Sequence, residues 1–415
     1  MTLGRLTPLL VGRCPGDWRQ VFIDEVTELL TNGYVGPSLP YQTDGPETGV
    51  RSLQGFNVRP NKIDFTNATW VTKGFHDRNQ KSCLREGDLL VVQSGHIGTA
   101  AVVPEAAAGS NCHALIISRF QRNKVDPYFV CHYINSEIGQ ARLRGLEVGS
   151  SMLHINTSEL GRFILPLPPL AEQRRLAEIL GTWDTALEKT ERLITNKERR
   201  KVGVMAALLT GQKRLRGFDA SWRHWHLGEL FRERIETNRD DLPLLSITSN
   251  DGVVLRSDLD RKDTSSDDKS KYLRICPGDI GYNTMRMWQG VSALSCYDGI
   301  ISPAYTVCIP GPEIDGRFAS YLFKLPVVIH LFYRYSQGLT SDTWNLKFRH
   351  FADIRVRIPE VDEQIAIASL LAVLDEELAI LKKEREALVQ QKRGLMQKLL
   401  TGQWRVRMNS DEVIA

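Results

Sequence analysis

The stretches ALLTGQKRLRGF (Ala207–Phe218) and KLLTGQWRVRMN (Lys398–Asn409) share the five residues LLTGQ. The shared residues lie 191 positions apart, and the same offset aligns Pro168–Arg216 with Pro359–Arg407 without a gap. About a third of the aligned positions are identical, among them an adjacent Glu-Gln pair near the start of each copy. Agreement over so long an ungapped window indicates an internal duplication, which constrains the whole fold.

Each copy of the duplicated segment predicts one long helix. Prolines precede it, and the Glu-Gln pair then begins the helix, where the helix dipole favours acidic residues. Apolar residues recur at steps of three and four until Gly211 in the first copy and Gly402 in the second, which suit the position after a helix end. We expect helices of ~35–40 residues, roughly 55 Å long. The residues expected to pack between them are Leu176, Leu180, Trp183, Leu187, Ile194, Leu208, Leu371, Leu374, Leu378, Leu381, Leu388, Leu395 and Leu399.

The two helices are equal in length and phase, so we expect them to pack as an antiparallel coiled coil about a pseudo-two-fold axis. The alternative is a pair of surface helices in a larger helical domain. Charged residues interrupt the apolar seam at Lys197, Lys201, Arg385 and Lys392. Their stems could lie along the seam, or their charges could contact another protein.

The composition is that of a globular protein with two or more domains. The chain has 415 residues, more than one ordinary core accommodates, with 42% hydrophobic and 25% charged residues. We expect no signal peptide and no membrane span. The seven cysteines form no C-x-x-C pair, so we expect reduced thiols in a cytosolic protein. The net charge of +4 permits a nucleic-acid partner without indicating one.

The segments 1–165 and 217–357 differ in sequence but follow one plan. Each has a strand introduced by Gly-Asp (Gly87-Asp88 and Gly278-Asp279), then an alternating apolar run, an amphipathic stretch and a glycine-led turn. This order predicts two mixed α/β domains with a common scaffold and divergent loops. Function commonly resides in such loops.

The loop after the Gly-Asp strand is the sharpest candidate for a surface that reads DNA bases. Arginine, asparagine and glutamine match the paired donors and acceptors of guanine or adenine in the major groove. The same residue types are also ordinary at a hairpin tip that has no partner, so both interpretations stand. The candidate residues are Gln93, Ser94, His96, Asn283, Thr284, Arg286, Trp288 and Gln289.

Catalytic motifs are missing from the sequence. There is no G-x-x-x-x-G-K-[ST] loop for a nucleotide, and the glycines after Val92 do not match G-x-G-x-x-G. The stretch Ile301–Tyr305 (ISPAY) departs from the S/N/D-P-P-Y/F motif of amino-methyltransferases at Ala304. No histidine pair or cysteine cluster has the spacing of a metal site. The sequence therefore favours a binding protein over an enzyme.

Taken together, the arrangement resembles the specificity subunit of type I restriction–modification enzymes. The resemblance covers essentially the whole chain and is carried by LPLPPLAEQRRLAEIL (165–180) and RIPEVDEQIAIASLL (357–371), each followed by its LLTGQ. The second copy has Pro359-Glu360-Val361 where the first has Pro168-Pro169-Leu170, but the Glu-Gln pair and the heptads remain.

The resemblance implies an α+β protein with two target-recognition domains, each reading one half of a split double-stranded DNA target, separated by the two long helices. It implies that the helices fix the spacing of the halves and dock two methyltransferase (M) subunits and, through them, restriction (R) subunits. The chain itself is then non-catalytic and cytoplasmic, and S-adenosylmethionine, ATP and Mg belong to its partners. The expected segments are the first recognition domain (1–165), the first helix (166–216), the second recognition domain (217–357), the second helix (358–407) and a tail (408–415).

Two clusters of basic residues are candidates for contacts with DNA phosphates, which supply most of the binding energy of such proteins. They are Lys73, Arg78 and Lys81 in the first segment, and Lys262, Lys269, Lys271 and Arg274 in the second. Since the loops of the two segments are unrelated, we predict a non-palindromic target. The alternative is a coiled-coil scaffold that never contacts DNA, and the salt dependence of DNA binding distinguishes the two.

Overall fold

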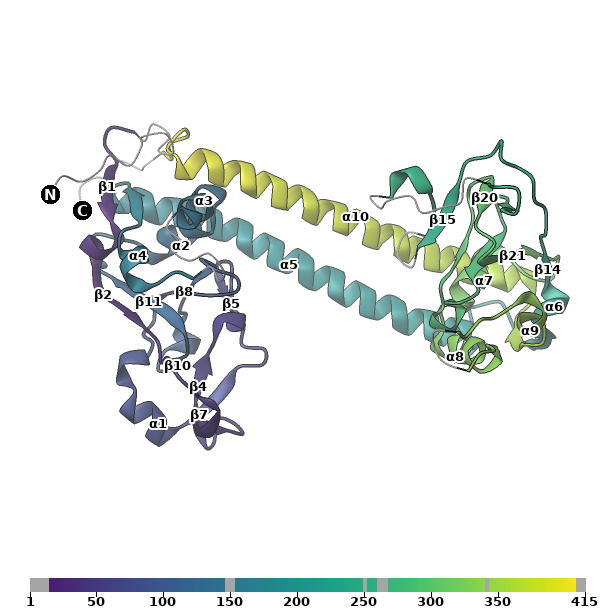
Figure 1. Cartoon of the computed structure of the whole chain (residues 1–415), viewed down its shortest axis with the longest axis horizontal. Coiled ribbons are helices and arrows are strands. Elements are labelled where there is room, and N and C mark those ends of the chain that lie inside the picture. Colours follow the sequence, from purple (N-terminus) through teal and green to yellow (C-terminus); the bar gives the residue numbers. More distant parts are fainter. Residues whose placement is uncertain (1–14, 146–153, 249–251, 260–267, 340–342, 408–415) are drawn as a thin grey trace. The chain divides into compact units, whose positions relative to one another are not determined.

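The computed structural model describes residues 15–145, 154–248, 252–259, 268–339 and 343–407. It confirms a mixed α+β fold in which two long helices pack together between β-rich regions (Figure 1). The helices are α5 (Leu170–Leu209) and α10 (Val361–Leu400), each of 40 residues. Both ends of α10 lie 191 positions after those of α5, so the duplication extends to the helix bounds.

The chain divides into two compact units. Unit 1 comprises Met1–Glu191 and Lys383–Ala415, and unit 2 comprises Arg192–Lys382. Unit 1 therefore contains the first part of α5 and the last part of α10, and unit 2 contains the remaining parts. Because the start of one helix packs beside the end of the other in each unit, the helices run antiparallel.

Unit 1 consists of short strands with helices between them. Its elements are β1 (Arg19–Phe22), β2 (Thr27–Asn32), β3 (Gln42–Thr43), β4 (Gly49–Leu53), β5 (Val58–Arg59), β6 (Lys62–Ile63), β7 (Thr69–Thr72), α1 (Lys73–Arg78), β8 (Leu89–Val92), β9 (Ala100–Val102), β10 (Asn111–Cys112), β11 (Leu115–Phe120), α2 (Pro127–Asn135), α3 (Glu137–Arg144), α4 (Thr157–Gly161) and β12 (Ile164–Leu167).

Unit 2 has a similar order of elements. They are β13 (Arg223–His226), α6 (Leu227–Leu230), β14 (Phe231–Glu233), β15 (Leu245–Thr248), β16 (Gly252–Leu255), β17 (Leu273–Ile275), β18 (Ile280–Asn283), β19 (Ser292–Leu294), β20 (Gly299–Ile301), β21 (Tyr305–Pro310), α7 (Gly316–Leu322), α8 (Pro326–Tyr335), α9 (Phe348–Ala352) and β22 (Arg355–Ile358).

Both units contain the same four-stranded antiparallel sheet, in the order β2-β11-β8-β9 in unit 1 and β14-β21-β18-β19 in unit 2. In each unit a two-stranded pair, β1-β12 or β13-β22, joins the first strand to the strand before the long helix. Unit 1 adds a second four-stranded sheet, β10-β4-β7-β3, and the pair β5-β6, whereas unit 2 adds the pairs β15-β16 and β17-β20. The shared sheet is the common scaffold, and the additions are where the units diverge.

The long helices contribute directly to the core of each unit. Leu176 and Leu180 of α5 join Leu399 of α10 in the core of unit 1, while Leu208 and Leu371 join the core of unit 2. Every residue expected in the seam is buried or half-buried. Apolar burial of this kind holds each unit to both helices.

The charged seam residues form ion pairs between the two helices. The amine of Lys392 pairs with Asp184, the amine of Lys201 with Asp375, and the amine of Lys197 with Glu377. The first two pairs are related by the 191-residue offset. Arg385 instead lies 3.7 Å from the carboxylate of Glu386 on its own helix.

A buried glutamine fixes the start of each long helix. The Gln173 side chain is fully buried, donates to the carbonyl oxygens of Lys124 (3.0 Å) and Pro168 (2.8 Å), and accepts from the Asp126 amide (2.8 Å). Gln364 makes the same three bonds in unit 2, to Glu313, Pro359 and Asp315. Asp126 and Asp315 cap the N-termini of α2 and α7. Gln173 therefore joins α5 to α2, and Gln364 joins α10 to α7, the equivalent helix of unit 2.

A buried glutamate joins each helix start to the end of the other helix. Glu172 accepts from the Trp18 indole (3.3 Å) and from the Arg405 guanidinium (2.8 and 2.9 Å). Glu363 makes the matching bonds to Trp222 (3.2 Å) and Arg214 (2.6 Å). The segment that follows each LLTGQ run is thereby fixed against the opposite helix.

Candidate nucleic-acid interface

The Gly-Asp turns position the strands that lead into the two candidate loops. Gly87 and Gly278 have φ of +81° and +91°, a conformation that favours glycine. The aspartates that follow are buried, and each forms a bidentate ion pair with an arginine. Asp88 binds Arg119 at 2.8 and 2.7 Å. Asp279 binds Arg234 at 2.7 and 3.1 Å. The Gly-Asp pattern therefore marks a structural feature, and the loops beyond it carry the variation.

The unit 1 loop exposes only part of the predicted set. Gln93 is buried, with 3% of its surface exposed, and its amide donates to Asn32 Oδ1 at 2.6 Å. This differs from the exposed position expected from the sequence, because Gln93 still faces the sheet where β8 ends. Ser94 and His96 are exposed at the tip, on either side of Gly95, whose φ is +79°.

The basic residues Lys73, Arg78 and Lys81 are all exposed on or just after α1. Figure 1 shows α1 at the end of unit 1 that is far from α5. The helix is held by buried Phe75, whose ring lies 4.8 Å from the rings of both Tyr34 and Tyr41. These cations project from a rigid support and can contact an anionic surface.

An arginine packed against two aromatic rings on the neighbouring sheet was not predicted from the sequence. The guanidinium of Arg51 (β4) lies 4.6 Å from the ring centroid of Phe65 and 5.4 Å from that of Trp70 (β7). Phe65 is 38% exposed. The pairing of β4 with β7 places Arg51 opposite Trp70, and Phe65 lies in the segment that leads into β7.

The unit 2 loop uses several predicted base readers to support itself. Asn283 Oδ1 accepts from the Met285 amide (3.0 Å), and the Thr284 hydroxyl donates to the Ala304 carbonyl (2.9 Å). The Trp288 indole donates to the Met285 carbonyl at 3.0 Å. Arg286 and Gln289 are exposed and make no such side-chain bond among the contacts of the described residues.

The predicted basic cluster of unit 2 is only partly described. Lys262 lies outside the described residues. Lys271 is exposed, and the Lys269 amine lies 5.2 Å from the ring centroid of Tyr272. These two lysines remain candidates for phosphate contacts.

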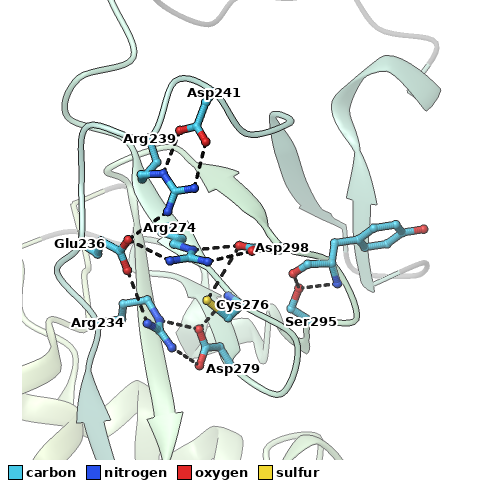
Figure 2. Close-up of polar contacts among 10 residues, drawn as sticks. Arg234, Glu236, Arg239, Asp241, Arg274, Cys276, Asp279, Ser295 and Asp298 are labelled. Carbon is cyan, nitrogen blue, oxygen red and sulfur yellow. Dashed lines mark hydrogen bonds and ion pairs between the residues drawn. The ribbon is translucent and has the colours of Figure 1, made fainter.

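Arg274 belongs to a network of ion pairs shown in Figure 2. It binds Asp298 at 2.9 and 2.8 Å and Glu236 at 3.0 Å. Hydrogen bonding to Asp298 and Glu236 raises the pKa of Arg274, and the bond from Arg274 lowers the pKa of Glu236. Glu236 also lies beside Arg234 and Arg239. The positive charge of Arg274 is thus already balanced by carboxylates of the protein, so Arg274 is a poor candidate for a phosphate contact.

In the described part of the chain, the residues that bear on metal or thiol chemistry include three buried cysteines and a buried histidine. The described residues contain no group of three or more His, Cys, Asp or Glu side chains arranged to hold a metal ion. Burial raises the pKa of the Cys112, Cys131 and Cys308 thiols, which keeps them protonated. Burial and the nearby Lys392 lower the pKa of His132 to about 3, so its ring is neutral at pH 7. Among the described helices, none combines the length and apolarity needed to cross a bilayer.

Comparison with known proteins agrees with this arrangement. Residues 15–196 match the family model of the type I restriction modification DNA specificity domain. A Methanocaldococcus jannaschii chain named as the specificity subunit of the type I restriction enzyme MjaX is 24% identical over 435 residues, covering 96% of each chain. The chain is therefore similar to the specificity subunits of type I restriction–modification enzymes. Members of this family are non-catalytic and carry the DNA target recognition of the system.

Two further specificity-subunit comparisons concern parts of the chain and its fold. The MjaVIII specificity subunit of the same archaeon is 25% identical over 214 residues, about half of each chain (50% and 49%). The solved S subunit from M. genitalium has a TM-score of 0.57 at 17% identity, covering 98% of this chain and 99% of that one. A structure on the assembly and conformational transition of a type I system gives 0.58 at 17%, covering 95% and 100%. These likenesses support the specificity-subunit fold.

Proposed function

We propose that this protein is a specificity subunit that recognises a bipartite, asymmetric DNA target, with one half read by unit 1 and the other by unit 2. The observation that carries the proposal is a comparison of the buried contacts and the exposed loop tips of the two units. The buried contacts that join the unit to the helices are repeated, whereas the exposed loop tips are unlike: Ser94 and His96 in unit 1, Met285 and Arg286 in unit 2. Two similar supports with unlike reading surfaces suit two unlike half-sites.

We further propose that α5 and α10 dock two methyltransferase subunits, and restriction subunits through them. Both helices expose apolar side chains away from their seam: Val202 is 61% exposed, Val373 is 59% and Ile380 is 67%. Exposed apolar surface on a helix pair suits a partner protein. S-adenosylmethionine, ATP and Mg would then be bound by these partners, in the cytoplasm where the DNA lies.

Phosphate contacts supply most of the affinity in this proposal, and base contacts supply the choice of sequence. Of the basic residues that the sequence predicts for phosphate contact, those exposed in the described part of the chain are Lys73, Arg78 and Lys81 in unit 1 and Lys271 in unit 2. Their side chains are long and flexible, so individual substitutions should weaken binding to all sequences alike.

The test measures duplex binding by the full chain in complex with its methyltransferase, at salt concentrations from 50 to 200 mM. If six to ten phosphates are neutralised, affinity should fall by roughly 10³–10⁵-fold across this range. Binding that is absent, or that does not change with salt, would instead support the alternative of a helical scaffold. Replacing Lys73, Arg78 and Lys81 together with glutamine should reduce the salt slope by about three.

A further inference from the structure

The tip of the unit 2 loop is Met285–Arg286, and the surrounding protein holds it rigidly. Besides the bonds of Asn283 and Trp288 to the Met285 backbone, the Arg286 amide donates to the Asn283 carbonyl at 3.0 Å. The Thr284 amide donates to Ala304 (3.0 Å), and the Thr284 carbonyl accepts from Leu346 (2.8 Å). The adjacent Met287 side chain is fully buried. The tip is thus fixed on both sides before any ligand binds, which lowers the entropy cost of recognition.

A row of aromatic rings packs beside this tip. Trp288 packs edge-on against Trp344, with 5.3 Å between centroids, and Trp344 packs edge-on against Tyr333 of α8 at 4.9 Å. Met285 is nevertheless 48% exposed and Arg286 is exposed. An apolar side chain held out into solvent beside a free guanidinium, in a loop that is fixed on both sides, indicates a recognition role.

The charge around the tip suits a polyanion. The loop packs against α8, and the Leu346 bond joins it to the segment that leads into α9. The described residues of these three segments (283–294, 326–339 and 343–350) contain no aspartate or glutamate. They expose four cationic side chains: Arg286, Arg334, Lys347 and Arg349. Such a one-sided balance attracts the phosphate backbone of DNA.

The chemistry of the tip matches two adjacent base pairs in the major groove. Arginine binds guanine O6 and N7 with two hydrogen bonds, and an apolar side chain contacts the C5-methyl group of thymine. Consecutive Cα atoms are about 3.8 Å apart, close to the spacing of about 3.4 Å between successive bases of one strand. One side chain can therefore face each base pair.

We propose that Met285 and Arg286 read a thymine next to a guanine in the half-site of unit 2, with Met285 packed on the thymine methyl group. The inference rests on the proposed DNA recognition and deepens it by naming two bases. Unit 1 has no equivalent, because its exposed tip residues Ser94 and His96 carry no comparable apolar group.

The experiment uses the full chain in complex with its methyltransferase and a duplex containing the target found by methylome sequencing. Each thymine of each half-site is replaced in turn by deoxyuridine, which removes only the methyl group. Loss of one buried methyl should weaken binding about fourfold at one position in the half-site of unit 2. The same replacement should have no effect in Met285→Ala, which lacks the methyl contact already.

Arg286→Ala should weaken binding by roughly tenfold and relax the preference for guanine at the adjacent position. Ile235→Ala is the matched control, because Ile235 is an exposed apolar residue of unit 2 outside the loop (74% exposed) and should change neither result. Thermal unfolding and assembly with the methyltransferase verify that each variant folds.

A half-site with no adjacent guanine and thymine, or specific binding that is insensitive to every deoxyuridine, would overturn the inference. Both results leave the proposed function intact. Failure of that function has a different signature, since no duplex would then be preferred over any other.

Discussion

Unit 1 and unit 2 use the same contacts to hold the long helices and different residues to face solvent. In both, a buried glutamine joins the helix start to a capping aspartate, and a buried glutamate binds a tryptophan and an arginine. The sheets added to the shared scaffold differ in strand number and strand order, and the loop tips differ in sequence. The duplicated residues are therefore those that fix each unit on the helices. The residues free to diverge are those available to a ligand.

The largest expected effect comes from the buried glutamines. Replacing Gln173 or Gln364 with leucine leaves buried backbone groups without partners, and each substitution should destabilise its own unit by about 3 kcal/mol. Hydrogen exchange measured separately for the two units tests this, with the exposed Gln390→Leu as control. A large loss of stability with one of the two substitutions and none with the other would show that Gln173 and Gln364 are not equivalent.

Acid should affect unit 1 more than unit 2. The pKa of His132 is about 3 in the folded protein and about 6.5 when unfolded, so the unfolded chain binds the extra proton as the pH falls below 6.5. Unit 1 should therefore lose about 2 kcal/mol of stability between pH 7 and pH 5. His132 faces Asp184 of α5 and Lys392 of α10.

The comparison with unit 2 supplies the control for this pH effect. In unit 2, Tyr321 of α7 donates to Asp375 at 2.7 Å, where Asp375 matches Asp184. His132→Tyr should therefore remove the acid sensitivity of unit 1, as followed by hydrogen exchange at both pH values. Equal sensitivity of the variant and the natural chain would contradict the assignment to His132.

A smaller difference is expected at the glycines that end the long helices. Gly211 and Gly402 have φ of +72° and +71°, so alanine at either position should cost roughly 1 kcal/mol. A Cβ at Gly402 would also overlap Pro15 Cδ, whereas at Gly211 it would lie 3.5 Å from Trp222. Gly402→Ala should thus be about 1 kcal/mol more destabilising than Gly211→Ala, as measured by denaturant unfolding. Equal losses would show that Pro15 yields without cost.

The long helices were predictable because their signals are local. Prolines, the Glu-Gln pair, the heptad pattern and the terminal glycine all lie within one segment, and the structure begins and ends the helices there. The pairing of Lys201 and Lys392 with aspartates was not predictable from one helix alone. It depends on how the second helix is placed against the first.

The loops were harder to interpret because residue type alone does not distinguish a side chain that contacts DNA bases from one that stabilises the loop. Gln93, Asn283 and Trp288 have side chains suited to bases, yet each is engaged in the protein itself. Met285 was missed because its exposure depends on distant partners of the loop, Ala304 and Leu346. The sequence points to the loop, and the fold decides which of its residues face outward.

The most direct test of whether the two units recognise different half-sites is the adenine methylation motif produced by this chain with its methyltransferase. This motif is compared with the one produced by Arg286→Ala. We expect a non-palindromic motif in two halves, of which the substitution relaxes only one. A palindromic motif, or a change in both halves, would contradict it.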